Sequence, residues 1–201
     1  QLEEQFNPHF IFNVLETLRY EIAIDAAKAS DMVMAFANLM RYSIYYGSTI
    51  VPLQTDIEYI NDYLLLQKMR YNRRLNYHID IPEELMGCKI PKLLLQPVVE
   101  NSLVHGMKDI RSIAINISAW KEKGQLKLCV EDNGSGIREE KLEELRKGLE
   151  REDVYREHIG LYNSHRVVRL LYGLESSMTI ESSPGNGTKV TVTLPADMEE
   201  I

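Results

Sequence analysis

Residues 94–108 read LLQPVVENSLVHGMK and lie in a segment that is apolar almost all round. This pattern predicts a buried helix, which we expect at residues 91–107. Asn101, His105 and Lys108 interrupt it at i, i+4 and i+7 spacing. A polar stripe on a buried helix faces a cleft or a partner; an amide oxygen suits Mg²⁺, and His or Lys suits phosphate. A satisfied polar seam or an exposed edge would explain the spacing equally well.

A second motif follows the strand expected at residues 125–131. The apolar side chains of this strand alternate onto one face, and Asp132 falls in phase with them. A carboxylate at the rim of the core needs a hydrogen-bond donor, and the amino group of a purine is a candidate. The glycines of Asn133-Gly134-Ser135-Gly136 let the backbone approach a ligand closely. Taken alone, Asp-Asn-Gly is commonly only a turn.

Two further glycine motifs are weak on their own. Gly160-Leu161-Tyr162-Asn163 opens an expected helix, and a helix N-terminus next to glycine is a ready anion site. Gly185-Asn186-Gly187-Thr188 reads most simply as a hairpin turn. The order of the four motifs along the chain is more informative than any one of them.

Hydrophobic periodicity beyond residue 74 predicts a mixture of strands and helices. We expect strands at 75–81, 112–121, 125–131, 178–183 and 188–194, and helices at 91–107, 138–150 and 161–172. This α+β content suggests helices stacked on one face of a mixed sheet.

The N-terminal third has the period of amphipathic helices. The first apolar stripe comprises Phe6, Phe10, Val14, Leu18 and Ile22, and the second, within residues 30–46, comprises Val33, Phe36, Leu39, Met40 and Ile44. A short connection makes the pair an antiparallel hairpin, and two hairpins would complete a four-helix bundle. Another helix is expected at 53–73. The rhythm changes near Leu75, so we place a boundary between a helical region, 1–73, and a second domain, 74–201.

Composition bounds the class of function. The net charge of −7, with no block rich in Lys or Arg, argues against a nucleic-acid groove. Cys88 and Cys129 form no Cys-x-x-Cys pair, which argues against a zinc site and fits a reducing cytosol. No apolar stretch approaches the ~20 residues of a spanning helix. The chain begins in helical rhythm without Met, so we expect a longer protein whose N-terminal sensor could carry membrane spans, with this part at the cytoplasmic face of a bacterial membrane.

In this order and spacing, the four motifs resemble the nucleotide-binding boxes of the ATPase superfamily shared by DNA gyrase, the Hsp90 chaperones, MutL and the histidine kinases. The resemblance covers residues 75–195 and implies an α/β sandwich that binds ATP and Mg²⁺. It implies Asn101 on Mg²⁺ and Asp132 on the adenine amine, with a lid hinged near Gly160. The nucleotide-binding residues that it implies are Asn101, His105, Lys108, Asp132, Gly134, Gly136, Ile137, Gly160, Leu161, Asn163 and Thr188.

The sequence Asn7-Pro8-His9-Phe10-Ile11-Phe12-Asn13, together with residues 94–101 and His105-Gly106, resembles the LytS-type sensor histidine kinases. This resemblance implies a homodimer that phosphorylates His9 from ATP and passes the group to an aspartate of a response regulator. A neutral, exposed imidazole is nucleophilic near neutral pH, which suits the role. Pro8 lacks an N–H, so the helix either kinks there or starts there with Asn7 as its cap. Without the ATP motifs, His9 would be read as a surface residue at a helix start.

Two further residues receive catalytic roles by position. Asn13 lies one turn after His9, where many histidine kinases place a group thought to orient water for dephosphorylating the regulator, and we hypothesise this role for it, separate from autophosphorylation. Phe10 stands where many of these kinases have an acidic residue, so the general base is unassigned and Glu100 is our candidate. His158 replaces a glycine usual in the family and could stiffen the lid or reduce ATP affinity.

The residues leave two other functions open. One is a catalytically weak module that binds nucleotide but acts through dimerisation and docking. The other is a non-kinase ATPase of the same superfamily, in which the N-terminal helices only clamp a dimer. Formation of phosphohistidine on His9 distinguishes the kinase from both.

Overall fold

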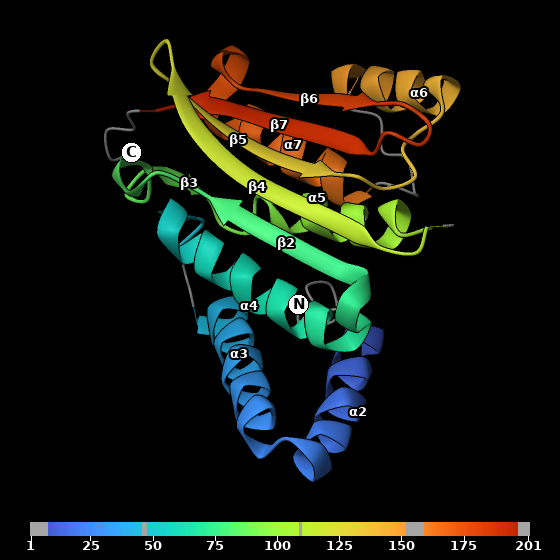
Figure 1. Ribbon diagram of the computed structural model, residues 1–201. Coiled ribbons are helices and arrows are strands. Elements are labelled where there is room, and N and C mark those ends of the chain that lie inside the picture. The colour runs from blue at the N-terminus through green and yellow to red at the C-terminus, as the bar shows by residue number, and fades with distance from the viewer. Residues whose placement is uncertain (1–7, 46–47, 109, 152–158, 197–201) are drawn as a thin grey trace. The chain divides into compact units, whose positions relative to one another are not determined.

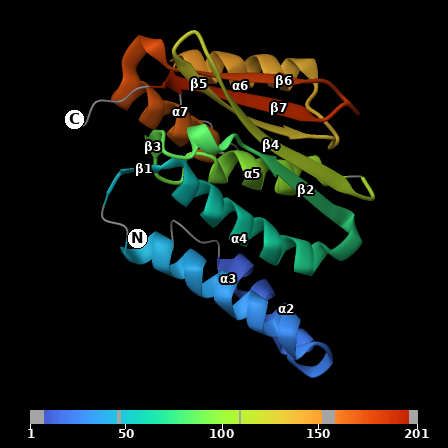
Figure 2. The same cartoon turned by 60° about the vertical axis from the view of Figure 1, so that its left-hand side comes forward.

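The computed structural model describes residues 8–45, 48–108, 110–151 and 159–196. The chain forms two compact units, Gln1–Thr49 with Ile57–Leu75 and Ile50–Asp56 with Asn76–Ile201, which we call the helical unit and the sheet unit. Figures 1 and 2 show the elements of each. Helix α4 (Leu53–Tyr71) contributes its first turn to the sheet unit and the rest to the helical unit. The predicted boundary between a dimerisation region, 1–73, and an ATP-binding domain, 74–201, stays a prediction.

The helical unit contains the predicted hairpin. Its helices are α2 (Pro8–Ile24) and α3 (Ala26–Tyr45), and a 3-10 turn (Asn72–Arg74) follows α4. Asp25 alone separates α2 from α3, and its Oδ1 accepts a hydrogen bond from the backbone N–H of Lys28 at 3.1 Å. This contact satisfies one of the free N–H groups at the start of α3. Asn7 lies outside the described residues, and with it the question of whether the helix starts or kinks at Pro8.

Part of both predicted apolar stripes is exposed on the hairpin. Ile22 of α2 is 63% exposed, and Val33 and Ile44 of α3 are 49% and 51% exposed. The buried side of α3 runs through Met32, Ala35 and Leu39, of which only Leu39 belongs to the predicted stripe. Two packed helices cover only a narrow face of each other, so the hairpin alone leaves the remaining apolar side chains uncovered.

The sheet unit is built on a five-stranded sheet with strand order β2-β4-β5-β7-β6. The strands are β2 (Leu75–Asp80), β4 (Ile113–Glu122), β5 (Gln125–Asp132), β6 (Ser177–Ser182) and β7 (Thr188–Pro195). β4, β5, β7 and β6 pair antiparallel, whereas the β2 and β4 arrows point the same way in Figure 1. The helices α5 (Gln96–Asn101), α6 (Glu139–Arg151) and α7 (Ile159–Tyr172) lie behind the sheet in that view. The predicted fold class is confirmed.

Alternation along the central strands builds the core of the sheet unit. Leu126, Leu128 and Val130 of β5 are no more than 1% exposed, and Leu128 pairs with Val192 of β7. Side chains two residues apart share a face of a strand. Asp132 continues the same phase and is buried at the end of β5, as the sequence predicts.

The prediction of a helix at residues 91–107 is wrong for the first residues of that range. There, β3 (Lys89–Pro91) pairs with β1 (Ile50–Pro52) in a small second sheet. Leu93 follows with a φ of 60°, and its N–H donates a hydrogen bond to Asp56 Oδ1 at 2.7 Å. A left-handed residue cannot belong to an α-helix. An apolar run by itself does not separate helix from turn, which is why the prediction failed.

The second half of that segment is helical but not uniformly α-helical. After α5, residues Ser102–Gly106 form a π-helical segment. Such turns are rare and occur often at functional sites. The other predicted strands and the helices of the sheet unit agree with the structure to within two residues, whereas α3 begins four residues before the predicted 30.

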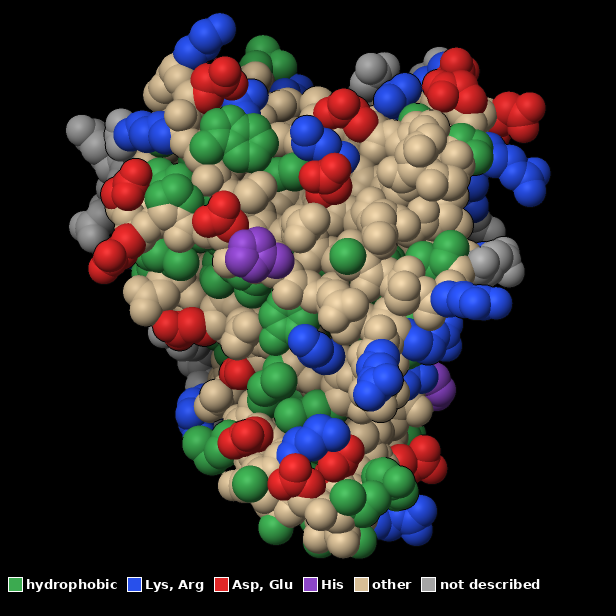
Figure 3. Space-filling view, in the orientation of Figure 1, with side chains coloured by type: hydrophobic (Ala, Val, Ile, Leu, Met, Phe, Trp, Pro, Cys, Tyr) green, Lys and Arg blue, Asp and Glu red, His purple; other side chains and the backbone are tan. Residues whose placement is uncertain are grey.

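The described surface carries charges of both signs. Figure 3 shows Asp and Glu side chains beside Lys and Arg on the face that it draws. Among the helices in the described ranges, none has the length and apolar character needed to cross a membrane.

An ion pair links the two helices of the hairpin. Glu21 of α2 is 7% exposed, and its Oε1 lies 2.6 Å from Lys28 Nζ of α3. We expect Lys28→Met to lower the free energy of unfolding by about 1–2 kcal/mol, because it keeps the aliphatic stem but leaves a buried carboxylate without its cation. Urea unfolding followed by circular dichroism measures the change. The double variant Glu21→Gln/Lys28→Met should recover most of the loss; an undiminished loss would assign the effect to packing.

Candidate functional site

The carboxylate of Asp132 is the centre of a polar network in the sheet unit. Asp132 is 4% exposed. Its Oδ2 accepts a hydrogen bond from the Ser102 hydroxyl at 2.7 Å. Its Oδ1 accepts from the backbone N–H of Gly134 at 2.9 Å and of Thr188 at 3.2 Å. The three donors come from the π-helical segment, the loop after β5 and the start of β7.

Burial sets the electrostatics of this carboxylate. Desolvation raises the pKa of Asp132 above its ordinary 3.8, and the hydrogen bonds from Ser102, Gly134 and Thr188 oppose that rise. A carboxylate has about four acceptor positions, and these protein donors occupy three of them. Asp132 can therefore accept one more donor from a bound molecule.

The loops around Asp132 interlock through their backbones. The N–H of Ser135 donates to Gly106 O at 3.0 Å, and the N–H of Gly185 donates to Ser135 O at 2.8 Å. A Cβ on Gly134 would lie 2.5 Å from Gly106 Cα, so only glycine permits this approach. Gly136 has a φ of 68°, and a Cβ there would overlap the carbonyl of Ser183. These contacts fix the floor of the site.

A cavity of about 500 Å³ opens beside this floor. Eight of the predicted nucleotide-binding residues line it: Asn101, His105, Lys108, Asp132, Gly136, Ile137, Leu161 and Thr188. Gly134, Gly160 and Asn163 are not among the lining residues. Gly134 lies beneath Asp132, and Asn163 is exposed. Gly160 faces Pro97, because a Cβ at position 160 would lie 2.8 Å from Pro97 Cβ.

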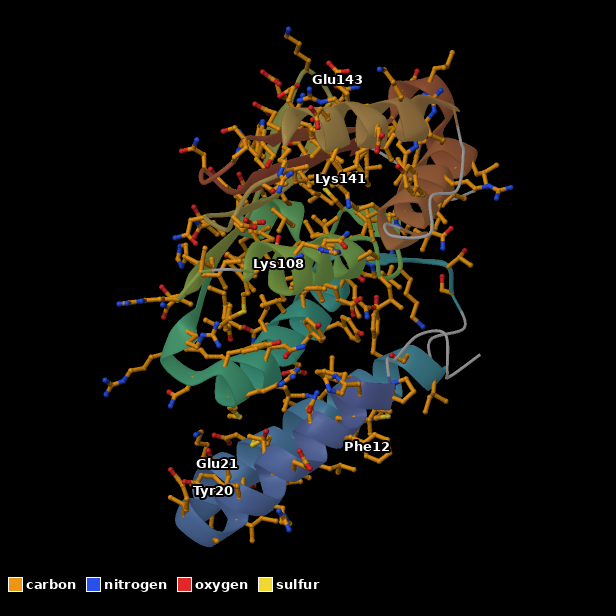
Figure 4. The ribbon with its side chains drawn as sticks, turned by 90° about the vertical axis from the view of Figure 1, so that its right-hand side faces the viewer. Phe12, Tyr20, Glu21, Lys108, Lys141 and Glu143 are labelled. Carbon is orange, nitrogen blue, oxygen red and sulfur yellow. The ribbon has the colours of Figure 1, made fainter. Side chains whose placement is uncertain are left out.

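The cavity has two kinds of wall that the sequence motifs did not reveal. Its apolar wall includes Val98, Leu145, Ile180 and Val190. Its charged wall comprises Arg138, directly before α6, and Glu140, Lys141 and Glu144 of α6. Figure 4 labels Lys108, in the turn after the π-helical segment, and Lys141 on α6, which both line the cavity. The helical period of α6 turns Leu145 inward and could have indicated this wall.

Ser102 was also missed. It sits directly after Asn101 and four residues before Gly106, which itself approaches Asp132. A serine and a glycine four residues apart lie on the same side of a buried helix. Two such small residues could have indicated that this side packs closely against the strand that ends at Asp132.

Asn101 is the cation ligand that the sequence predicts for the cavity. Among the described residues, no group of three or more His, Cys, Asp or Glu side chains is placed to bind a metal ion. Asn101 gives the cavity an amide oxygen. Mg²⁺ is commonly held by one or two protein oxygens plus the phosphates of a substrate, so this donor fits a phosphate-bound Mg²⁺.

Glu100 is not brought to the cavity. Its Oε1 accepts a hydrogen bond from Gln96 Nε2 at 2.8 Å, and it is absent from the lining. Burial raises the pKa of the Glu100 carboxyl, and the bond from Gln96 partly offsets the rise.

His9 and Asn13 lie on α2 in the helical unit. His9 is exposed and Asn13 half-buried, and Asn13 Nδ2 donates a hydrogen bond to His9 Nδ1 at 3.0 Å. Phe10 is only 8% exposed, and its ring centroid is 5.2 Å from that of Tyr63. His158 lies outside the described residues.

Comparison with known families matches both parts of the chain. Residues 1–75 match the family described as histidine kinase. Residues 89–198 match the family described as histidine kinase-, DNA gyrase B-, and HSP90-like ATPase. The chain is 31% identical over 195 residues to the sensor protein kinase HptS of Staphylococcus aureus, with 97% of this chain and 38% of that protein aligned. It thus spans well under half the length of this relative.

Solved structures show the same fold. The histidine kinase domain of the blue-light activated kinase EL346 from Erythrobacter litoralis aligns with a TM-score of 0.53 at 18% identity, over 96% of this chain and 91% of that one. The catalytic domain of histidine kinase ThkA aligns with a TM-score of 0.57 at 15% identity, over 75% of this chain and 98% of that one.

The raised pKa of Asp132 makes a prediction about stability. The folded protein binds a proton at this carboxyl more tightly than the unfolded chain does. The protonated carboxyl therefore contributes fully to the free energy of unfolding below the unfolded pKa of 3.8. This contribution is lost as pH rises through the higher folded pKa. Asp132→Asn cannot ionise, and its amide can still accept from the two backbone N–H groups. We expect the variant to gain stability relative to wild type as pH rises through this window and to hold that gain above it. Urea titrations of both proteins from pH 4 to 8 test this; a pH-independent difference would contradict it.

Proposed function

The chain belongs to the histidine kinase-, DNA gyrase B- and HSP90-like ATPase family and carries a histidine kinase domain in front of it, and we propose from this that it is the phosphoacceptor and catalytic part of a sensor kinase of a two-component system. The observation that carries the proposal is the combination of an exposed His9 on α2 with a cavity centred on the buried Asp132. The site geometry and both family matches support the same activity.

ATP is the proposed substrate of the cavity. The free acceptor position of Asp132 suits the amino group of adenine, and the apolar wall suits the face of the base. Asn101, His105 and Lys108 line the same cavity and would meet the phosphates and their cation. Mg²⁺, when bound there, would offset the negative charge of the phosphoryl oxygens.

His9 is the proposed acceptor of the γ-phosphoryl group. A neutral imidazole needs exposure and orientation rather than a strong base, and α2 provides both. The group then passes to an aspartate of a response regulator. Glu100 stays the proton acceptor proposed from the sequence: its raised pKa favours proton uptake, whereas its absence from the cavity lining argues against direct transfer to it.

A homodimer is the proposed assembly. Phe12, Ile22 and Ile24 of α2 are 67%, 63% and 61% exposed, an apolar area that a second hairpin would cover in a four-helix bundle. The Asn-Pro-His-Phe-Ile-Phe-Asn sequence supports the LytS-type branch of these kinases. We further propose that the chain acts at the cytoplasmic face of the membrane, as part of a longer sensor protein.

Labelled ATP provides the main test of the kinase. We expect wild type to form acid-labile, base-stable phosphohistidine. His9→Ala should lose this label while keeping nucleotide binding, and Asn101→Ala should reduce it by about 100-fold or more because the phosphates lose their anchor. Label that persists in His9→Ala would exclude His9 as the acceptor. Phosphate release without phosphohistidine would favour a non-kinase ATPase, and binding without either reaction would favour a docking module.

Asn13 of α2 has a proposed role in dephosphorylating the response regulator. Asn13→Ala should slow the loss of phosphate from a separately phosphorylated response regulator by about tenfold, because the attacking water loses a hydrogen-bond partner. Using regulator that is already phosphorylated keeps this rate independent of the kinase reaction. An unchanged rate would contradict the role.

A further inference from the structure

Ser102 and Asp132 form a hydrogen-bonded pair at the cavity. Ser102 begins the π-helical segment, Asp132 ends β5, and both residues line the cavity. They are 7% and 4% exposed, and the Ser102 hydroxyl donates to Asp132 Oδ2 at 2.7 Å. A serine in a helix can turn its hydroxyl back to the carbonyl oxygen four residues earlier. The hydroxyl of Ser102 crosses to the sheet instead, so its proton is committed to Asp132.

The hydrogen bonds of Asp132 are divided unevenly between its two oxygens. Oδ1 accepts from the backbone N–H of Gly134 and of Thr188, whereas Oδ2 accepts from the Ser102 hydroxyl. Each carboxylate oxygen has about two acceptor positions. The position that remains for a ligand therefore belongs to Oδ2. A donor on the ligand would share this oxygen with Ser102.

The pair presents acceptors to a bound molecule. With its proton committed, the Ser102 hydroxyl can only accept a hydrogen bond from a ligand, and ionised Asp132 can likewise only accept. The amino group of a 6-amino purine carries two N–H donors and suits two neighbouring acceptors. The carbonyl oxygen of a 6-oxo purine would instead meet their lone pairs. In a buried site, a polar group that lacks a partner of the right kind is costly.

We propose that Ser102 is a positioning residue for base recognition: its hydroxyl holds Asp132 as a hydrogen-bond acceptor, so that the cavity selects ATP over nucleotides with a 6-oxo purine. Asp132 contacts the base, and Ser102 determines whether that contact accepts or donates a hydrogen bond. The inference rests on the proposed binding of ATP and extends it to the choice between bases.

Burial works against the acceptor form of Asp132. Desolvation raises the pKa of this carboxyl, and the Ser102 hydroxyl has the largest effect among the groups that oppose the rise. A protonated carboxyl carries an O–H donor, which could bind the carbonyl oxygen of a 6-oxo purine. Loss of the Ser102 hydroxyl should therefore weaken the binding of ATP and favour its 6-oxo analogue.

Inosine triphosphate is the probe for this specificity, because it has a carbonyl oxygen where ATP has the amino group. Isothermal titration calorimetry in the presence of Mg²⁺ gives the Kd of each nucleotide. We expect wild type to prefer ATP, and Ser102→Ala to reduce the ratio of the two affinities by about tenfold. Ser102→Thr keeps the hydroxyl and should keep the wild-type ratio.

Ser164→Ala is the matched control. Ser164 of α7 is also 7% exposed, its hydroxyl donates to Leu94 O at 3.4 Å, and it is not among the lining residues. This variant also loses a buried hydroxyl but should keep the wild-type ratio. Both nucleotides are measured on the same folded sample, so a loss of stability alone leaves the ratio unchanged.

The inference is overturned by an unchanged ratio in Ser102→Ala, by an equal change in Ser164→Ala, or by a ratio in Ser102→Thr that falls as far as in Ser102→Ala. The calorimetry needs no phosphoryl transfer. A preference for ATP that is lost in Ser102→Ala therefore supports the inference even if wild type forms no phosphohistidine, which would count against the proposed kinase reaction alone.

Discussion

The sheet unit depends on a carboxylate that is buried and must be hydrogen-bonded. Removing Asp132 from water is costly unless donors surround it. Ser102, Gly134 and Thr188 supply those donors at 2.7–3.2 Å, and each belongs to a different segment of the chain. The carboxylate therefore brings together a helical segment, a glycine loop and a strand that lie far apart in the sequence. The cavity floor follows from this one electrostatic requirement.

Local pattern predicted the elements of this fold better than their contacts. The alternation of β5 was enough to place Asp132 in phase with Leu128 and Val130. The apolar run before α5 was misread, because the Leu93 backbone is fixed by a hydrogen bond to Asp56, 37 residues away. Ser102 was missed for the same reason: its partner Asp132 is 30 residues away. A periodic signal reports which face is buried, but not which distant group it meets.

The α2 helix shows how packing assigns chemistry to one side of a helix. Phe10 and Val14 face the interior of the helical unit, whereas His9 is exposed. Sequence alone identified these residues but could not supply the hydrogen bond from Asn13, which depends on the side-chain torsions. Burial therefore keeps Phe10, the residue that follows the histidine, away from the exposed side on which His9 lies.

The π-helical segment Ser102–Gly106 is wider than an α-helix of the same number of residues. Its backbone hydrogen bonds join residues five apart, whereas those of an α-helix join residues four apart. Ser102 at its start binds Asp132, and His105 near its end lines the cavity. In an ordinary α-helix each residue advances by about 100° around the axis, so the same residues in α geometry would place the side chains of Ser102 and His105 at a different angle to each other. The wider turn therefore lets one short segment supply both a donor to the floor of the cavity and a side chain to its lining.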